Sequence, residues 1–105
     1  MKIYAEELRI IMDAIMAMFD GGDEQRCDAV FQALAAKTLP ESVHLLCLAA
    51  ANSWRLAQTV TEPGDKNTLQ RSAIVQLLAA FGRLNGLAAT EAYILQRNKE
   101  QLGLR

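Results

Sequence analysis

Apolar residues recur along the chain at spacings of three and four, the pattern of α-helices that bury one face. In the stretch LRIIMDAIMAMF at positions 8–19, ten of twelve residues are apolar and only Arg9 and Asp13 are polar. Three apolar seams follow this helix: Tyr4, Leu8, Ile11, Ile15 and Met18; Met12, Met16 and Phe19; and Ile3, Ile10, Ala14 and Ala17. A helix that is apolar on nearly every side is expected to be covered on nearly every side.

Turn and capping residues divide the apolar pattern into segments. DGGD at 20–23 predicts a helix end at Gly21 and a new N-cap at Asp23. EPGD at 62–65 predicts a type II turn centred on its Pro-Gly pair, and NG at 85–86 predicts the end of a further helix. The expected helices are therefore five, at about 2–20, 23–37, 40–60, 66–85 and 89–102.

These elements predict a single all-α domain over residues 1–105, a compact bundle of four to five antiparallel helices. The runs LLCLAAA at 45–51 and AIVQLLAAF at 73–81 are also strongly apolar. Three such helices carry more apolar surface than one short chain easily hides, so we expect a homodimer or higher oligomer. Two alternatives remain: a monomer whose exposed apolar groove takes a partner helix, and a monomer with the first helix at its centre.

The expected self-association interface combines the first helix with two positions of the third. Its candidate residues are Ile11, Met12, Ile15, Met16, Phe19, Trp54 and Arg55. Met side chains suit adaptable contacts, although Met at helical spacing is also ordinary core filler. Trp54 is expected to be a core anchor, and an interface anchor is its alternative role, since Trp and Arg are enriched at interface hot spots.

Composition and charge add little about partners. The apolar fraction is 51% and the formal net charge is −1. Charge is net −3 over residues 1–40 and net +3 over 65–105. Solvated helix faces explain this asymmetry, and head-to-tail self-association or a weak anionic contact through the last helix are alternatives. No signal peptide and no unbroken apolar run of about 20 residues is apparent, which predicts a cytoplasmic protein without a membrane contact.

The residues that usually carry chemistry do not form a known motif. Cys27 and Cys47 fall on apolar helix faces, so we expect buried, reduced thiols. His44 is the single histidine, and with two cysteines it does not complete a zinc site. No glycine-rich phosphate loop occurs. We therefore expect no catalytic residue, no metal and no cofactor.

One enzymatic alternative comes from a slight resemblance. The stretch GLAATEAYILQRNKEQ resembles the last helix of all-α nucleoside triphosphate pyrophosphohydrolases of the MazG type. That family holds Mg²⁺ with helical E-x-x-E and E-x-x-D motifs, and these do not follow here. Glu6 and Glu7 are succeeded at the third position by Arg9 and Ile10. The resemblance implies at most a degenerate, metal-free relative.

A second alternative is a small DNA-binding regulator that uses the 66–102 helix pair as a helix-turn-helix. The last helix carries polar side chains able to contact phosphates or bases, namely Gln96, Arg97, Asn98, Lys99 and Gln101. Of these, Gln96, Arg97 and Lys99 also form a candidate polar face for a protein partner. The interpretation preferred from the sequence is a non-enzymatic accessory or regulatory protein that self-associates and binds another macromolecule.

Overall fold

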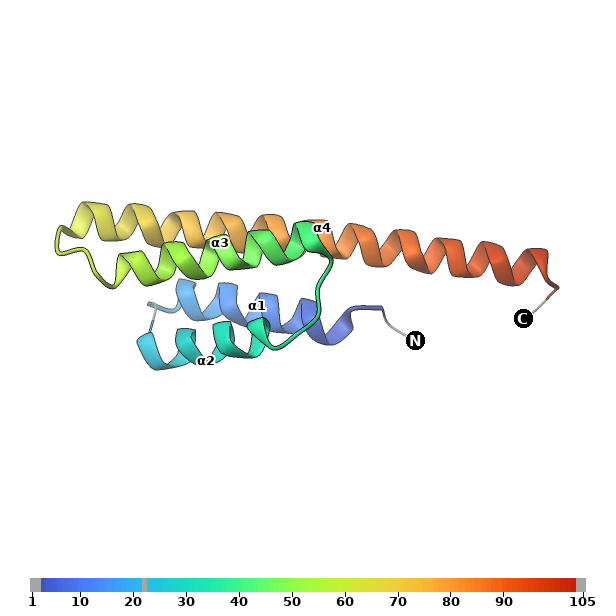
Figure 1. Cartoon of the computed structure of the whole chain (residues 1–105), viewed down its shortest axis with the longest axis horizontal. Helices are drawn as coiled ribbons and strands as arrows, with labels where there is room; N and C mark the ends of the chain where they lie inside the picture. Colours follow the sequence, from blue (N-terminus) through green and yellow to red (C-terminus); the bar gives the residue numbers. More distant parts are fainter. Residues whose placement is uncertain (1–2, 22, 104–105) are drawn as a thin grey trace.

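The computed structural model describes residues 3–21 and 23–103. It contains four helices in this part of the chain: α1 (Ala5–Phe19), α2 (Glu24–Ala35), α3 (Glu41–Ala57) and α4 (Pro63–Gln101) (Figure 1). No strand occurs among the described residues, so the prediction of an all-α fold is confirmed. The molecule measures 61 × 20 × 19 Å, which makes it elongated rather than compact.

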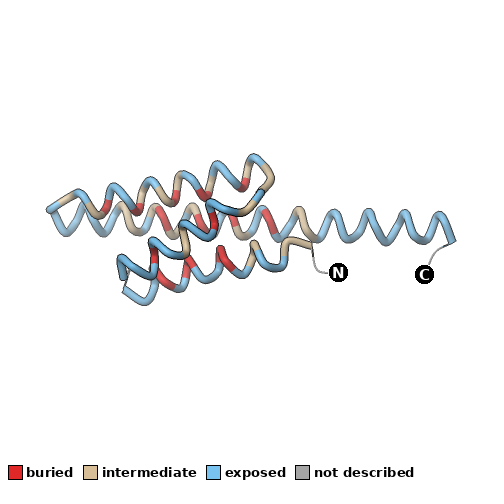
Figure 2. The backbone as a smooth tube through the Cα atoms, turned by 60° about the horizontal axis from the view of Figure 1, so that its bottom comes forward, coloured by how far each residue is buried: buried red, intermediate tan, exposed pale blue. Residues whose placement is uncertain are grey.

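The four helices form two antiparallel hairpins that pack against each other (Figures 1 and 2). α1 pairs with α2 and α3 pairs with α4, and the hairpins meet mainly where α1 lies against α4. The contact between α2 and α3 is slight, and the diagonal pairs do not meet. This is the up-down-up-down order that short connections favour.

The core is built from aliphatic side chains and many alanines. Its largest completely buried side chains are Ile11, Leu77, Leu84, Val43 and Cys27. Alanines at 50, 73 and 80 are completely buried as well, and small side chains at a helix contact allow the two axes to approach closely. The α3–α4 hairpin is accordingly the most extensive packing interface in the bundle.

α4 is one continuous helix of 39 residues, and the predicted helix end at 85–86 is wrong. Leu84 before this pair is buried and Leu87 after it packs against the core, so both flanks are held in helical register. A glycine inside a helix costs only about 1 kcal/mol relative to alanine. Thr90, whose hydroxyl donates to the Gly86 carbonyl at 2.9 Å, lies within the helix instead of starting a new one.

Two smaller predictions have opposite outcomes. Gly21 has a φ of +107°, and the Asp23 carboxylate accepts a hydrogen bond from the Arg26 backbone N–H at 3.2 Å, so the predicted boundary between α1 and α2 is confirmed. The predicted turn at Pro63 is wrong, because Pro63 is the first residue of α4. Proline suits this position since its missing N–H would have no partner in a first helical turn.

The last part of α4 extends beyond the bundle (Figure 1). The hydroxyl of Tyr4, at the start of α1, donates to the Glu91 carboxylate at 3.4 Å. Beyond this contact every described residue of α4 is exposed (Figure 2). We call residues 91–101 the α4 overhang.

By length and composition alone, α4 is the one helix in the described part of the chain that is long and apolar enough to cross a membrane. The sequence showed no unbroken apolar run of about 20 residues, whereas the mean hydropathy over a window of this continuous helix is high. Four residues of α4, Ala73, Leu77, Ala80 and Leu84, are completely buried in the bundle. Of the most apolar 18-residue window of α4, 22% is buried inside the bundle.

Candidate interaction surfaces

A row of exposed apolar side chains lies on the side of α1 that faces away from the core. Met12, Met16 and Phe19 are 37, 46 and 62% exposed. The expectation that α1 is covered on nearly every side is therefore wrong: its first and third seams are buried or partly buried, and the Met12 seam is open. The four-helix arrangement explains this, because α1 has only α2 and α4 as neighbours.

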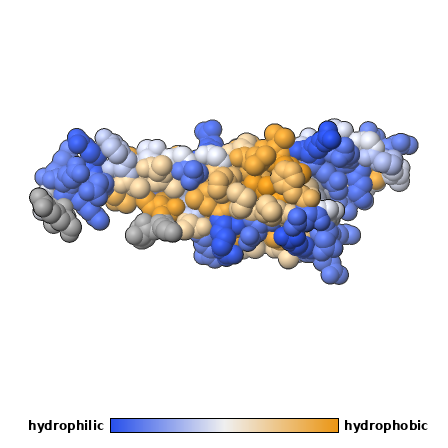
Figure 3. Space-filling view, turned by 180° about the vertical axis from the view of Figure 1, so that it is seen from behind, coloured by the Kyte–Doolittle hydropathy of each residue, from blue (hydrophilic) through white to orange (hydrophobic). Residues whose placement is uncertain are grey.

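Exposed apolar residues of α4 lie at the same level as this row. Tyr4 contacts Glu91, and the two helices run in opposite directions. Phe19 lies fifteen residues after Tyr4 in α1. In the antiparallel α4, the position at the same level is fifteen residues before Glu91, which is position 76. Val75 and Leu78, which are 63 and 48% exposed, flank that level. We call Met12, Met16, Phe19 and Leu78 the α1–α4 face, whereas Val75 lines a groove with Thr68, Arg71, Ser72 and Gln76. Seen from behind, the molecule shows a broad hydrophobic area (Figure 3).

Three of the predicted interface residues are not accessible. Ile11, Ile15 and Trp54 are 0, 3 and 5% exposed, so they belong to the core of the folded bundle. Trp54 packs beside Phe31 with ring centroids 5.7 Å apart. Its Nε1 is buried without a hydrogen-bond partner among the described residues. The burial of Trp54 supports its expected role as a core anchor over the alternative of an interface anchor.

The remaining predicted interface residue, Arg55, is exposed on the outer side of α3. Its guanidinium donates to the Asn52 side-chain oxygen at 3.4 Å, and the two residues line a shallow groove with Leu56 and Thr59. α3 lies on the opposite side of the molecule from the area shown in Figure 3 (Figures 1 and 3). Arg55 is therefore not part of the α1–α4 face.

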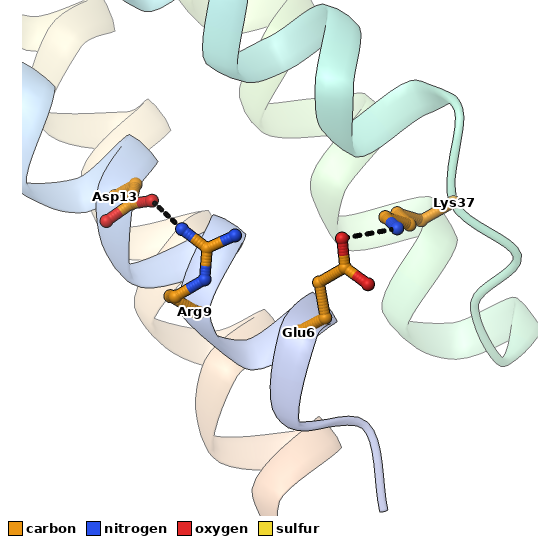
Figure 4. A network of polar contacts seen from close by, with 4 residues as sticks. All are labelled: Glu6, Arg9, Asp13 and Lys37. Atoms are coloured by element: carbon orange, nitrogen blue, oxygen red, sulfur yellow. Dashed lines mark hydrogen bonds and ion pairs between the residues drawn. The ribbon is translucent and has the colours of Figure 1, made fainter.

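Charged residues border the start of α1 (Figure 4). The Lys37 ammonium contacts the Glu6 carboxylate at 2.8 Å and joins the end of α2 to the start of α1. The hydrogen bond and charge of Lys37 lower the pKa of Glu6. Arg9 and Asp13 form an ion pair one helical turn apart at 3.3 Å, on the polar strip that the sequence predicted between the apolar seams.

The α4 overhang has an apolar side and a polar side. Ile94 and Leu95 are 50 and 46% exposed on the side that continues the buried side of α4. Gln96, Arg97 and Lys99, the candidate polar face, are all exposed. Arg97 and Gln96 both contact the Glu100 carboxylate, at 3.9 and 3.4 Å.

A small apolar groove of about 50 Å³ lies where α2 and α3 meet loosely. His44 and Cys47 line it together with Phe31, Leu34, Ala35, Leu39, Leu48 and Ala51. Burial raises the pKa of Cys47 to about 11, and burial also raises the pKa of Cys27. Both cysteines are free and buried, as the sequence predicted, and a protonated thiol is a poor nucleophile.

The described residues contain no cluster of three or more His, Cys, Asp or Glu side chains able to hold a metal ion. The helix-turn-helix alternative required a turn between 85 and 89, and the continuous α4 removes that turn. Comparisons of the chain with family models, with curated proteins and with solved structures find no match. The exposed surfaces are therefore the features from which a function can be inferred.

Proposed function

We propose that this chain is a non-enzymatic helical interaction protein, which self-associates and binds another macromolecule as an accessory or regulatory factor. The observation that carries the proposal is the α1–α4 face. Four large apolar side chains of this face remain exposed although the core of the bundle is complete without them. Contiguous apolar surface of this kind on a folded domain typically marks an interaction site.

The α1–α4 face is assigned to a protein partner that supplies an amphipathic helix. Met12, Met16 and Phe19 follow each other at spacings of four and three, so they form one ridge along α1. A partner helix binds such a surface with its own residues at helical spacing. The flexible thioethers of the two methionines suit a surface that adapts to its partner.

The contact with the partner can be tested by site-specific photo-crosslinking in cells. A photo-reactive amino acid is placed at Met16, and at Gln25 on the exposed surface of α2 as the matched control. We expect a discrete adduct with another protein from position 16 and none from position 25. Absence of an adduct, or the same adducts from both positions, would contradict the assignment.

Self-association is tested by molar mass in solution, from light scattering coupled to size exclusion at low and high salt. We expect a mass above the 11.6 kDa of one chain that salt does not reduce. A monomer at every concentration would contradict self-association. Mg²⁺-dependent consumption of a nucleoside triphosphate, or salt-dependent binding to random duplex DNA, would contradict the non-enzymatic interaction role.

A further inference from the structure

The side of α4 that is buried in the bundle continues along the overhang. Leu84 is completely buried there and Leu87 packs against the core. At helical spacing on the same side follow Glu91, Ile94, Leu95, Asn98 and Leu102. Ile94 and Leu95 in the overhang, and Leu102 directly after it, are 50, 46 and 73% exposed, so the stripe continues beyond the bundle with exposed apolar side chains.

The order of residue types along this stripe is the same in both directions. From Leu87 to Leu102 it is apolar, polar, apolar, apolar, polar, apolar, with the midpoint between Ile94 and Leu95. When two such stripes lie antiparallel about that midpoint, Leu87 faces Leu102, Glu91 faces Asn98, and Ile94 faces Leu95 of the second copy. The segment is about 24 Å long at 1.5 Å per residue, enough for four turns of helix.

We propose that the α4 overhang pairs antiparallel with the overhang of a second copy of this chain. The proposal rests on the self-association included in the proposed function and assigns it to a place on the molecule. Six exposed apolar side chains are covered in the pair: Ile94, Leu95 and Leu102 from each copy. The side-chain amide of Asn98 in one copy donates to the Glu91 carboxylate of the other.

The two polar residues are the reason for choosing a second copy as the occupant. A lipid surface, or a uniformly apolar partner, would bury the Asn98 amide without a hydrogen bond and leave the Glu91 carboxylate with the Tyr4 hydroxyl alone, which is costly. A second copy supplies the complementary group at both positions. Buried polar residues that pair in one register are a known means of fixing register and orientation between helices.

Charge supports the same register. Leu95 lines an open groove with the first turn of α1, where Glu6 and Glu7 lie beside Glu91. Lys99 is one turn after Leu95, on the same side of α4. In the antiparallel pair, Lys99 of one copy comes to the level of position 90 of the other, next to its Glu7 carboxylate. The basic end of the chain thus meets the acidic start of the second copy.

The test compares charges placed on the two sides of the overhang. A variant that combines Ile94→Asp and Leu95→Asp places charge at the centre of the pairing. Tyr93→Asp is the matched control, because Tyr93 is 65% exposed on the opposite side of the same turn. All three positions are exposed, so far-ultraviolet circular dichroism is expected to show an unchanged helix content. We expect the double variant to be monomeric by light scattering and Tyr93→Asp to remain a dimer.

A charge reversal tests the register. Lys99→Glu is expected to weaken the dimer about tenfold, and the addition of Glu7→Lys in the same chain is expected to restore it. Leu95→Cys is expected to form an intermolecular disulfide readily, since the two copies of this residue meet near the symmetry axis, whereas Tyr93→Cys is not.

The outcomes separate this inference from the proposed function. A dimer that persists in the Ile94→Asp, Leu95→Asp variant would overturn the overhang pairing and leave self-association through another surface intact. A dimer lost equally in Tyr93→Asp would also overturn the pairing. A wild-type monomer at every concentration would overturn both.

Discussion

The Tyr4 hydroxyl and the Glu91 carboxylate are 3.4 Å apart and join the start of α1 to α4 at the end of the bundle. Partial removal from water raises the pKa of Tyr4, and the Glu91 charge raises it further. Up to this point α4 supplies core residues, and beyond it α4 supplies only surface. One helix therefore has a structural half and an exposed half, and the two can be altered separately.

Removal of the exposed half tests this division. A chain that stops after Glu91 retains every buried residue of the core. We therefore expect the same helical bundle, with a change in the free energy of unfolding below about 1 kcal/mol when measured on monomers. Thermal unfolding followed by circular dichroism at low protein concentration provides the measurement. Loss of cooperative unfolding would show that the overhang is needed for the fold.

Adjacent residues of α1 are expected to respond differently to the same substitution. Ile11 is completely buried and Met12 is 37% exposed. Ile11→Asp places an unpaired charge in the core, so we expect it to destabilise by about 4 kcal/mol or more and to unfold the protein. Met12→Asp is expected to stay folded, with a loss of about 1 kcal/mol or less. Denaturant unfolding of the two variants checks both values, and equal losses would contradict the burial pattern of α1.

Gly86 is expected to be a weak point of α4 that can be strengthened. A methyl group added there meets no atom within 4 Å. Gly86→Ala should therefore raise the free energy of unfolding by about 0.5–1 kcal/mol through helix propensity. Gly86→Pro should lower it by about 3 kcal/mol, because proline removes a backbone hydrogen bond and clashes with the preceding turn. If proline were tolerated and alanine gave no gain, α4 would not be continuous at this position.

The two cysteines are expected to report on unfolding. With a pKa of about 11, only about one Cys47 thiol in a thousand is ionised at pH 8. Ellman's reagent should therefore label the native protein slowly and the denatured protein at once. The variants Cys27→Ser and Cys47→Ser assign the two labelling rates. Fast labelling of native Cys47 would show that the loose α2–α3 contact opens readily.

The Glu6–Lys37 pair predicts how stability changes in acid. Lys37 lowers the pKa of Glu6 in the folded protein, so the unfolded chain binds the proton more readily. The contribution of this pair is present above the unfolded pKa of Glu6 and is lost as the pH falls through the folded pKa. Lys37→Met should remove this part of the acid dependence, and Lys66→Met, which removes the same charge at an exposed position of α4, serves as the control. The free energy of unfolding of the two variants is measured between pH 3 and pH 7. The same pH dependence in both variants would contradict a contribution from the Glu6–Lys37 pair.

The helical class and the buried seams of α1 were predictable, because they follow from residue spacing alone. Ile11 and Ile15 lie in the core as their spacing indicates. The Met12 seam has the same local pattern, yet it is exposed. Whether a second seam is covered depends on how many neighbours a helix has, and that number is set by the packing of all four helices.

The region around Asn85 and Gly86 shows a different limit of prediction. Asn-Gly favours turns in isolation, and a turn was predicted here. Packing of Leu84 and Leu87 on either side, and the Ala-, Gln- and charge-rich sequence that follows, favour helix over several turns. This sum outweighs one pair of poor helix formers. The exposed stripe of the overhang was not predicted, because it continues the buried side of α4 only if the helix is continuous through Asn85 and Gly86.

The continuity of α4 also has a mechanical consequence. The bundle holds the first half of α4, and the exposed half moves with it because the helix is continuous. Any small tilt of its anchored half, for example when a partner wedges against Leu78, displaces the tip in proportion to its distance from Glu91. Because Leu78 of the α1–α4 face and the overhang belong to the same helix, a shift of its anchored half would move both. Gly82 and Gly86, the two glycines of α4 between Leu78 and Glu91, are where the helix would bend first.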